Sequence, residues 1–498
     1  MLKNYLKIAF RNIGNHKTYS FLNIFGLAIG VSACLLILQY VRYETSYENF
    51  HQNAGQIHRA TVDLYNGAEY VETDCGMYAP LGPTLKEEMP EVLDFVRFYP
   101  FSLKEVKVEN KHFFEDKIYF TDPSVFSIFT HIPISGDLNA ALKNPFEAVI
   151  TKSAAIKYFG QVDVVDKSLQ IENKDYKIQA VIEDLPPNTH LKYDFLLSRS
   201  SVQTLMPWYH ENPWKINNEF TYLMLQPGID LSDFNAKLYD FSESKRAEIK
   251  DEKFSVQPIN DIHLYSNLSS EPEISGNAQI VYFLLAIGLI ILIIAWINYI
   301  NLSTARAISR AKEVGIRKVV GSSKTQLVFQ YFIESSIINA LAVILAILMV
   351  YLAMPAFLEI SGHPSSSNDF SDPFFWNLVM GIFSLGTIFS GLYPAFVLSS
   401  FKPVYVLKGK FQNAGHGLWL RKGLVVFQFS AAVMLIVLSS SIYLQINHIQ
   451  KQDLGLKIDQ TLVLRAPSGY WEPGTAQNIE VLKDKLFQNY WRPVKIMN

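Results

Sequence analysis

The residues most suggestive of chemistry form a short Gly-Ser-Lys run between two apolar stretches. Gly321-Ser322-Ser323-Lys324-Thr325 ends in the Lys-Thr pair with which phosphate-binding loops hold nucleotides. Such a loop needs Gly-x-x-x-x-Gly-Lys-Ser/Thr after a strand, because backbone N–H groups of the glycine turn wrap the phosphates. Here Lys318 and Ser323 occupy the two glycine positions, and the run follows an apolar segment rather than a strand. The sequence therefore predicts no nucleotide site.

The histidines, serines and cysteines of the chain form no pattern typical of an enzyme. His51 and His58 are the closest pair of histidines, and their spacing differs from the His-Glu-x-x-His of zinc enzymes. The sequence contains no Gly-x-Ser-x-Gly elbow, and nothing singles out two carboxylates for acid–base work. Cys34 lies in an apolar stretch and Cys75 in a polar one, so no disulfide framework is implied. We predict no catalytic residue, no metal site and no cofactor bound by this chain.

The elements that position these residues are mainly long apolar segments. A helix needs about 20 apolar residues to cross a hydrocarbon core roughly 30 Å thick. Five windows meet this requirement: 21–41, 279–300, 333–354, 376–397 and 424–446. The only charged residue within them is Glu334, close to the start of the third window. The fold class predicted is a polytopic α-helical membrane protein.

The charges between these windows indicate an orientation. Segments 1–20 and 399–423 contain lysine and arginine but no acid, and 302–330 is strongly basic, whereas the short segment 358–373 is acidic. Because basic residues are retained in the cytoplasm, the amino terminus is expected there, with 42–277 outside. Residues 1–20 also alternate apolar and basic positions at helical spacing, which predicts an amphipathic helix on the inner leaflet.

Residues 42–277 are expected to form a mixed α/β extracytoplasmic domain. Segments 176–182 and 220–225 have the composition of strands, and 83–89, 153–159 and 233–241 that of short helices. Acidic side chains outnumber basic ones in this region. This excess favours solubility and identifies no ligand.

The basic segment 302–330 is better explained as a helix than as a phosphate loop. At 3.6 residues per turn, one stripe is mainly basic and the opposite one small and apolar. The first stripe contains Arg306, Arg310, Glu313 and Arg317, and the second Ile308, Ala311, Gly315 and Val319. Gly321 suits the end of this helix, and Ser323 with Gln326 predicts a capping box that opens the next one. The stripes fit either anionic lipid head groups or a partner protein.

Several stretches resemble the FtsX-like and MacB-like permeases of ABC transporters. The segment that carries most of the resemblance is NYINLSTARAISRAKEVGIRKVVGSSKTQLVFQYFIES, and its most specific part is Lys312–Lys318 followed by Gly321. Supporting stretches are LKNYLKIAFRNI, FLNIFGLAIGVSACLLI, YETSYENFH, AAIKYFG, VIEDLPPNTH and INDIHLYS. The resemblance therefore extends over most of the chain.

This resemblance implies one span, a large extracytoplasmic domain, then three further spans in the bacterial cytoplasmic (inner) membrane. It also implies a separate ABC ATPase subunit, which binds the ATP and Mg²⁺, and a coupling helix that rests on it. By position, the expected ATPase-coupling residues are Glu313, Gly315, Arg317, Lys318 and Gly321. Mechanotransmission for export or efflux is then the expected function, by a non-catalytic subunit that binds no nucleic acid. Further partners compatible with the family are a second permease half or homodimer and a periplasmic adaptor.

The organisation of the amino terminus returns near the carboxyl terminus. Cations in 399–423 precede the fifth window, and 447–498 resembles the beginning of a second extracytoplasmic domain. Since 447–498 is much shorter than 42–277, we expect a two-repeat family member whose second repeat is truncated.

Two other functions remain compatible with these observations. One is an FtsX-like adaptor that activates envelope hydrolases with the same machinery. The other is a membrane receptor whose outer domain senses a ligand without ATP. The sequence does not identify a cargo.

Overall fold

The computed structural model describes most of the chain as two compact units. The residues outside this description are 1, 102, 208, 210–213, 246–248, 250, 364–369, 371, 401–414, 453–474 and 491–498. Within helices the side chains of some further residues, among them 306–315 and 317, also lie outside it. One unit comprises Met1–Thr45 with Ala278–Gln452, and the other Ser46–Asn277 with Asp453–Asn498. Each is described by itself.

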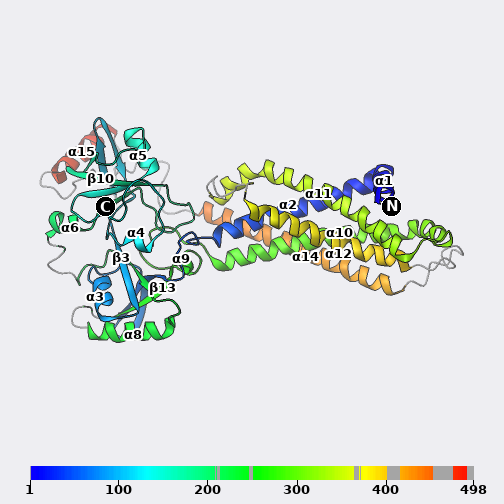
Figure 1. The fold of residues 1–498 in the computed structure, drawn as a ribbon, viewed down its shortest axis with the longest axis horizontal. Coiled ribbons are helices and arrows are strands. Elements are labelled where there is room, and N and C mark those ends of the chain that lie inside the picture. Colours follow the sequence, from blue (N-terminus) through cyan, green and yellow to red (C-terminus); the bar gives the residue numbers. More distant parts are fainter. Residues whose placement is uncertain are drawn as a thin grey trace. The chain divides into compact units, whose positions relative to one another are not determined.

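The first unit is a bundle of long helices (Figure 1). Its helices are α1 (Leu2–Asn15), α2 (Lys17–Glu44), α10 (Ala278–Val319), α11 (Lys324–Ser361), α12 (Pro373–Ser400) and α14 (Gly415–Lys451). Among the described residues, five helices are long and apolar enough to cross a membrane, one each in α2, α10, α11, α12 and α14. The predicted polytopic α-helical fold is confirmed.

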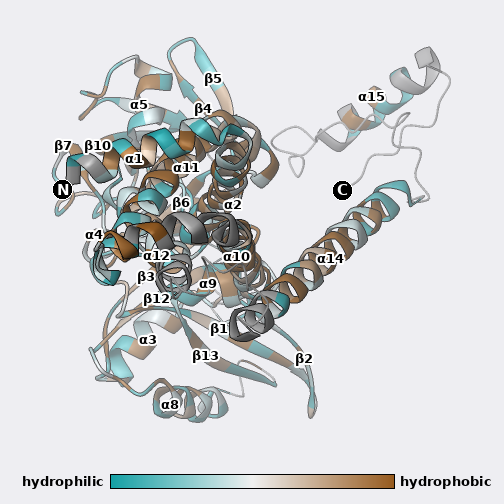
Figure 2. Ribbon diagram, turned by 90° about the vertical axis from the view of Figure 1, so that its right-hand side faces the viewer, coloured by the Kyte–Doolittle hydropathy of each residue, from teal (hydrophilic) through white to brown (hydrophobic). Residues whose placement is uncertain are grey.

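The bundle is built around α2, which packs against both α10 and α11. Close approach of α2 and α10 depends on small residues, since a Cβ added at Gly30 would lie 2.5 Å from the Cβ of Ala295. Helix α12 packs against α10 and α11, and α14 packs against α10. Figure 2 shows apolar residues through the middle of α14, and its membrane-spanning window has no buried residue, as expected of a helix that faces lipid.

Buried polar side chains tie these helices together. Tyr299 of α10 donates a hydrogen bond of 2.9 Å to Ser335 of α11. The Asn339 amide donates one of 2.9 Å to Ser390 of α12. Interhelical bonds of this kind stabilise packing where lipid provides no hydrophobic drive between helices.

Helix α1 lies against α11. The ring of Tyr5 meets that of Phe329 edge-to-face at 6.0 Å, and the Asn12 amide donates a 3.3 Å hydrogen bond to Glu334. Leu6 and Phe10 are exposed one turn apart, as an amphipathic helix beside a membrane requires. Its position on an inner leaflet remains a prediction.

The second unit is an α/β domain with a 13-stranded sheet. The main strand order is β13-β1-β12-β3-β6-β11-β8-β10-β9-β4-β5, with β2 beside β1 and β7 beside β10. The strands are β1 (Ile57–Asn66), β2 (Glu69–Asp74), β3 (Val92–Pro100), β4 (Lys104–Val108), β5 (Lys111–Glu115), β6 (Ile118–Thr121), β7 (Pro133–Gly136), β8 (Glu147–Thr151), β9 (Ser168–Ile171), β10 (Lys174–Ile182), β11 (Phe195–Ser198), β12 (Phe220–Leu225) and β13 (Glu252–Pro258). The β8–β10 and β6–β11 pairs are parallel, and the other pairs are antiparallel.

Short helices connect these strands. They are α3 (Leu81–Glu88), α4 (Val125–Ile128), α5 (Lys152–Phe159), α6 (Ser200–Leu205), α8 (Leu231–Ser244) and α9 (Ile259–Tyr265). The three predicted helices correspond to α3, α5 and α8, and the two predicted strands to β10 and β12. The prediction of a mixed α/β domain is confirmed.

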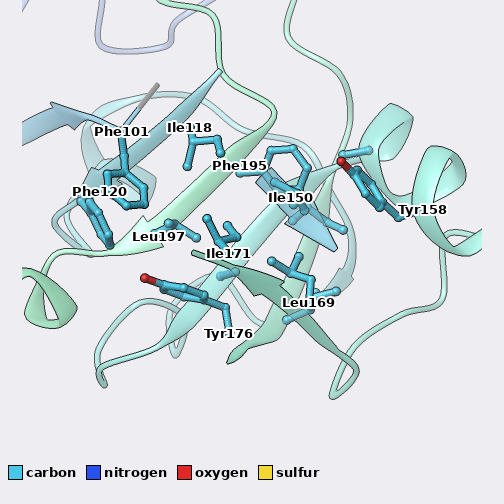
Figure 3. Close-up of a cluster of buried hydrophobic side chains, with 14 of the residues drawn as sticks. Phe101, Ile118, Phe120, Ile150, Tyr158, Leu169, Ile171, Tyr176, Phe195 and Leu197 are labelled. Atoms are coloured by element: carbon cyan, nitrogen blue, oxygen red, sulfur yellow. The ribbon is translucent and has the colours of Figure 1, made fainter. Parts of the chain in front are cut away.

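Three hydrophobic clusters form the core of this domain. Figure 3 shows part of one, in which Phe195, Ile150 and Leu197 surround the position of Ile171. A second cluster is centred on Phe98 and Tyr222, and a third on Leu223 and Phe254. Because adjacent β12 residues point to opposite faces, Tyr222 and Leu223 belong to different clusters.

Two predicted segments fall largely outside the described residues. In 399–423 the description covers the end of α12 and the start of α14. In 447–498 it covers the end of α14 and α15 (Thr475–Tyr490). The predicted second repeat therefore remains a prediction.

Candidate interaction surface

Helix α10 continues well beyond its membrane-spanning part. The apolar window predicted from the sequence ends at residue 300, whereas the helix ends at Val319. At 1.5 Å per residue, the 19 residues beyond the window add about 28 Å. The predicted span 279–300 and the first part of the predicted coupling segment thus form one continuous helix.

A tight turn at Gly321 joins α10 to α11. The N–H of Val320 donates to the carbonyl of Ile316 at 3.0 Å, and that of Gly321 to the carbonyl of Lys318 at 3.2 Å. Gly321 has φ +103°, in the left-handed region that side chains disfavour. No atom lies within 4 Å of a Cβ placed there, so the requirement for glycine is conformational and not steric.

The start of α11 is fixed by a capping box. Ser323 Oγ accepts a 3.3 Å hydrogen bond from the N–H of Gln326, whose side-chain oxygen accepts one of 3.0 Å from the N–H of Ser323. This reciprocal pair satisfies two backbone donors that the first helical turn leaves without partners. The predicted capping box is confirmed, and it leaves Lys324 as the first residue of α11.

Apolar side chains around this turn are exposed. Ile316, Val319 and Val320 are 56%, 66% and 82% exposed and recur at helical spacing, so they form one apolar face. Lys318 lies beside it and is partly buried. Burial, and then the nearby charge of Lys324, lower the pKa of the Lys318 ammonium. We use the name α10–α11 surface for Ile316, Lys318, Val319, Val320 and Gly321.

The predicted coupling residues lie on or next to this surface. Lys318 and Gly321 belong to it. Glu313, Gly315 and Arg317 lie in the last two turns of α10.

The sequence analysis did not single out Ile316 and Val320. Their only signal in the sequence is their helical spacing with Val319. Glu334 is buried, and its carboxylate accepts a hydrogen bond from the Asn12 amide.

The α10–α11 surface has the properties of a protein-binding site. It combines apolar side chains, the cation of Lys318 and a helix–turn–helix. In the described part of the chain no three His, Cys, Asp or Glu side chains group together as metal ligands. Such a surface can take up a partner with a complementary apolar and acidic face.

The fold and this surface define a class of protein. A helical bundle of membrane-spanning length with a large α/β domain inserted in the sequence between its first and second spans defines a polytopic membrane protein with one large non-spanning domain. Comparison with known proteins identifies the family within this class.

Two family models match in succession. The model of the MacB-like periplasmic core domain matches residues 20–240, and that of the FtsX-like permease C-terminal domain matches residues 285–408. The chain therefore belongs to the ABC transporter permeases that combine these two domains. The second match includes the α10–α11 surface.

Relatives with these names cover different shares of the chain. The uncharacterized ABC transporter permease YvrN of Bacillus subtilis (strain 168) is 22% identical over 442 residues, which is 81% of this chain and 99% of YvrN. The uncharacterized ABC transporter permease YknZ of the same organism is 27% identical over 168 residues, 31% of this chain and 40% of YknZ. The macrolide export ATP-binding/permease protein MacB of Bradyrhizobium diazoefficiens is 30% identical over 139 residues, 27% of this chain and 20% of MacB.

Among solved structures, the periplasmic region of MacB from Actinobacillus actinomycetemcomitans matches this chain with a TM-score of 0.32 and 13% identity, covering 41% of this chain and 90% of that one.

Proposed function

We propose that this chain is the membrane subunit of an ABC-type complex whose separate ATPase subunit binds the α10–α11 surface. The movement produced by ATP binding and hydrolysis passes along α10 and α11 and moves the α/β domain for export or efflux. In this arrangement the α10–α11 surface and the amino terminus are cytoplasmic, and the α/β domain is extracytoplasmic. The chain itself contributes no catalytic group.

The observation that carries this proposal is the continuity of α10. A helix that runs from the membrane to Val319 and is joined by a capped turn to α11 transmits displacement without a hinge. The exposed apolar face at its end provides a surface that a partner protein can bury. A relative named as an ATP-binding/permease protein supports an ATPase as that partner.

The experiment compares two substitutions at opposite ends of the bundle. Val320→Asp places a charge on the α10–α11 surface, and Ile360→Asp places one near the far end of α11, where Ile360 is 87% exposed. Burying a valine side chain contributes about 1.5–3 kcal/mol. Val320→Asp is therefore expected to weaken binding of the ATPase subunit about 10–100-fold, and Ile360→Asp to leave it unchanged.

The measurement is co-purification, then titration, of the full chain in nanodiscs with ATPase subunits from the same genome. Arg317→Glu, which reverses a predicted contact, is expected to weaken association while the chain still inserts in the membrane. Equal ATPase binding by the wild-type chain and both surface variants would refute the docking site.

A further inference from the structure

The α/β domain is connected to the helical bundle through two polypeptide segments. The first, Ser46–Gly55, follows α2, and the second, Ser266–Asn277, precedes α10. We call them the entry and exit segments. Within the domain the entry segment is held by a fully buried carboxylate and the exit segment by one that is 11% exposed, and the two carboxylates lead to the same strand.

The entry segment is held through Glu48. Its side chain is fully buried, and its backbone has φ +63°, a conformation that a non-glycine residue adopts only under constraint. Glu48 Oε1 accepts a hydrogen bond from the backbone N–H of His190 at 2.6 Å. The ring nitrogen Nδ1 of His190 lies 2.8 Å from the same oxygen. Thr189 donates to Oε2 at 3.2 Å, and Nε2 of His51 lies 3.1 Å from it.

The same stretch of chain also contacts the start of the entry segment. The Asn188 amide donates to the carbonyl and hydroxyl of Ser46 at 2.9 and 3.0 Å. The carbonyl of Asn188 accepts from the N–H of Glu48 at 3.1 Å. Residues 188–190 therefore contact both the backbone and the side chains of Ser46 and Glu48 at the start of the entry segment.

The exit segment is held through Glu271. Arg59 of β1, whose side chain is fully buried, donates to its two oxygens at 2.6 and 2.8 Å in a two-pronged ion pair. Arg59 also donates to Ser266 at 2.9 Å. Further along, Glu273 accepts a hydrogen bond of 2.5 Å from Lys192.

These contacts converge on one loop and one tyrosine. Residues 188–192, just before β11, contact the entry segment through Asn188, Thr189 and His190 and the exit segment through Lys192. Nε2 of His190 lies 2.6 Å from the hydroxyl of Tyr222 in β12, and Tyr222 is the register partner of Arg59. Both carboxylates are thus connected through one neighbour to the same residue of the central sheet.

We propose that loop 188–192 and the Arg59–Tyr222 pair form a common anchor that fixes both segments to the sheet. This proposal rests on the proposed function, since the anchor would be what turns movement of α2 and α10 into movement of the whole domain. His190 and Arg59 act as positioning residues. A carboxylate buried without its partner is strongly unfavourable, so loss of Arg59 is expected to release the exit segment. Loss of His190 leaves Glu48 without its main partner and displaces loop 188–192, which also holds the exit segment through Lys192, so it is expected to release both segments.

The matched control is another buried ion pair in the same sheet. Arg97 of β3 donates to both oxygens of Asp122 at 2.7 and 2.9 Å, and neither residue contacts the entry or exit segment in any described interaction. Arg97→Met should destabilise the sheet to a degree similar to Arg59→Met. It should leave the two segments attached.

The first test is hydrogen exchange of the full chain in nanodiscs without nucleotide. His190→Phe is expected to speed exchange in both segments about tenfold or more, and Arg59→Met to do so in the exit segment. Exchange in β8 and β10 serves as the check that the domain is folded. Two results would overturn the common anchor: release of the entry segment alone by His190→Phe, or equal release of both segments by Arg97→Met.

The second test adds the ATPase subunit and ATP. The nucleotide-dependent change in exchange of the wild-type α/β domain is expected to be lost in His190→Phe and Arg59→Met and kept in Arg97→Met, with ATPase binding equal in all. A full response in the anchor variants refutes the role of the anchor. An absent response in the wild-type chain refutes the proposed function instead, and the exchange experiment without nucleotide still decides whether the anchor exists.

Discussion

Replacing Glu48 by glutamine should make the stability of the α/β domain less dependent on pH. Burial by itself raises the pKa of this carboxyl group, but the charge and hydrogen bonds of His190, together with a contribution from His51, lower it to about 2. The carboxylate is therefore favoured in the folded state. A glutamine keeps the shape of the side chain and removes the charge.

The size of the effect follows from the difference between the folded and unfolded pKa. A shift from 4.5 to about 2 corresponds to about 3 kcal/mol, since each unit is worth 1.36 kcal/mol. Because the folded pKa is lowered, this stabilisation is fully present above about pH 4.5 and is lost as the pH falls toward 2. Glu48→Gln should cost about 3 kcal/mol at pH 7, and the difference from wild type should vanish near pH 2.

The assay is pulse proteolysis of the full chain in nanodiscs over a series of urea concentrations, with thermolysin near neutral pH and pepsin below pH 4. It reports the free energy of unfolding of the α/β domain. The control is Glu183→Gln, since Glu183 pairs with Lys152 at the surface with both side chains 42% exposed. This control should change stability by less than about 1 kcal/mol. A Glu48→Gln deficit that stays constant between pH 7 and pH 3 would refute an electrostatic role for Glu48.

Three further substitutions test the packing and the turn. Phe98→Ala removes a fully buried ring from the second hydrophobic cluster and should lower the free energy of unfolding of the α/β domain by about 3–5 kcal/mol, measured by the same proteolysis, with ATPase binding unchanged. Gly30→Leu should lower the melting temperature of the bundle in detergent because the new side chain would collide with Ala295. The control Gly26→Ala should be tolerated, since its Cβ would lie 3.5 Å from the nearest atom. Equal melting temperatures of the two variants would contradict the close contact between α2 and α10. Gly321→Val forces a branched side chain into a left-handed conformation at a cost of about 1–2 kcal/mol. ATPase binding in the titration assay should therefore weaken about tenfold. Unchanged binding would show that this turn does not position the α10–α11 surface.

Local sequence signals predicted the elements well where one physical cause dominates. The strand 220–225 coincides with β12 because alternating large residues fill a sheet buried on both faces. The capping box at Ser323 was also predictable, since it needs only two side chains three residues apart. The apolar windows gave the spans, but not the length of α10. The hydropathy of the sequence marks only the part of a helix that contacts lipid. The helix itself continues as long as its backbone hydrogen bonds are favourable, so its length is not given by the apolar window.

The contacts of the α/β domain could not be predicted in the same way. His51 and His58 were the histidines closest in sequence, yet it is His190 that shares Glu48 with His51. Glu48 and His190 are 142 positions apart, and nothing local to either marks the other. The order of the strands depends likewise on pairings across the whole domain, such as β12 with β3.

The pairing of β1 with β13 has a consequence for how the protein is made. These strands are the first and the last of the domain, at Ile57–Asn66 and Glu252–Pro258, and they lie side by side in antiparallel register. At about 5–20 residues per second, a ribosome needs roughly 10–40 s to synthesise the chain between them. For that time β1 has one long edge without its final neighbour, and such an edge invites pairing with other chains. Nascent chains of this protein should therefore need protection until Pro258 has emerged.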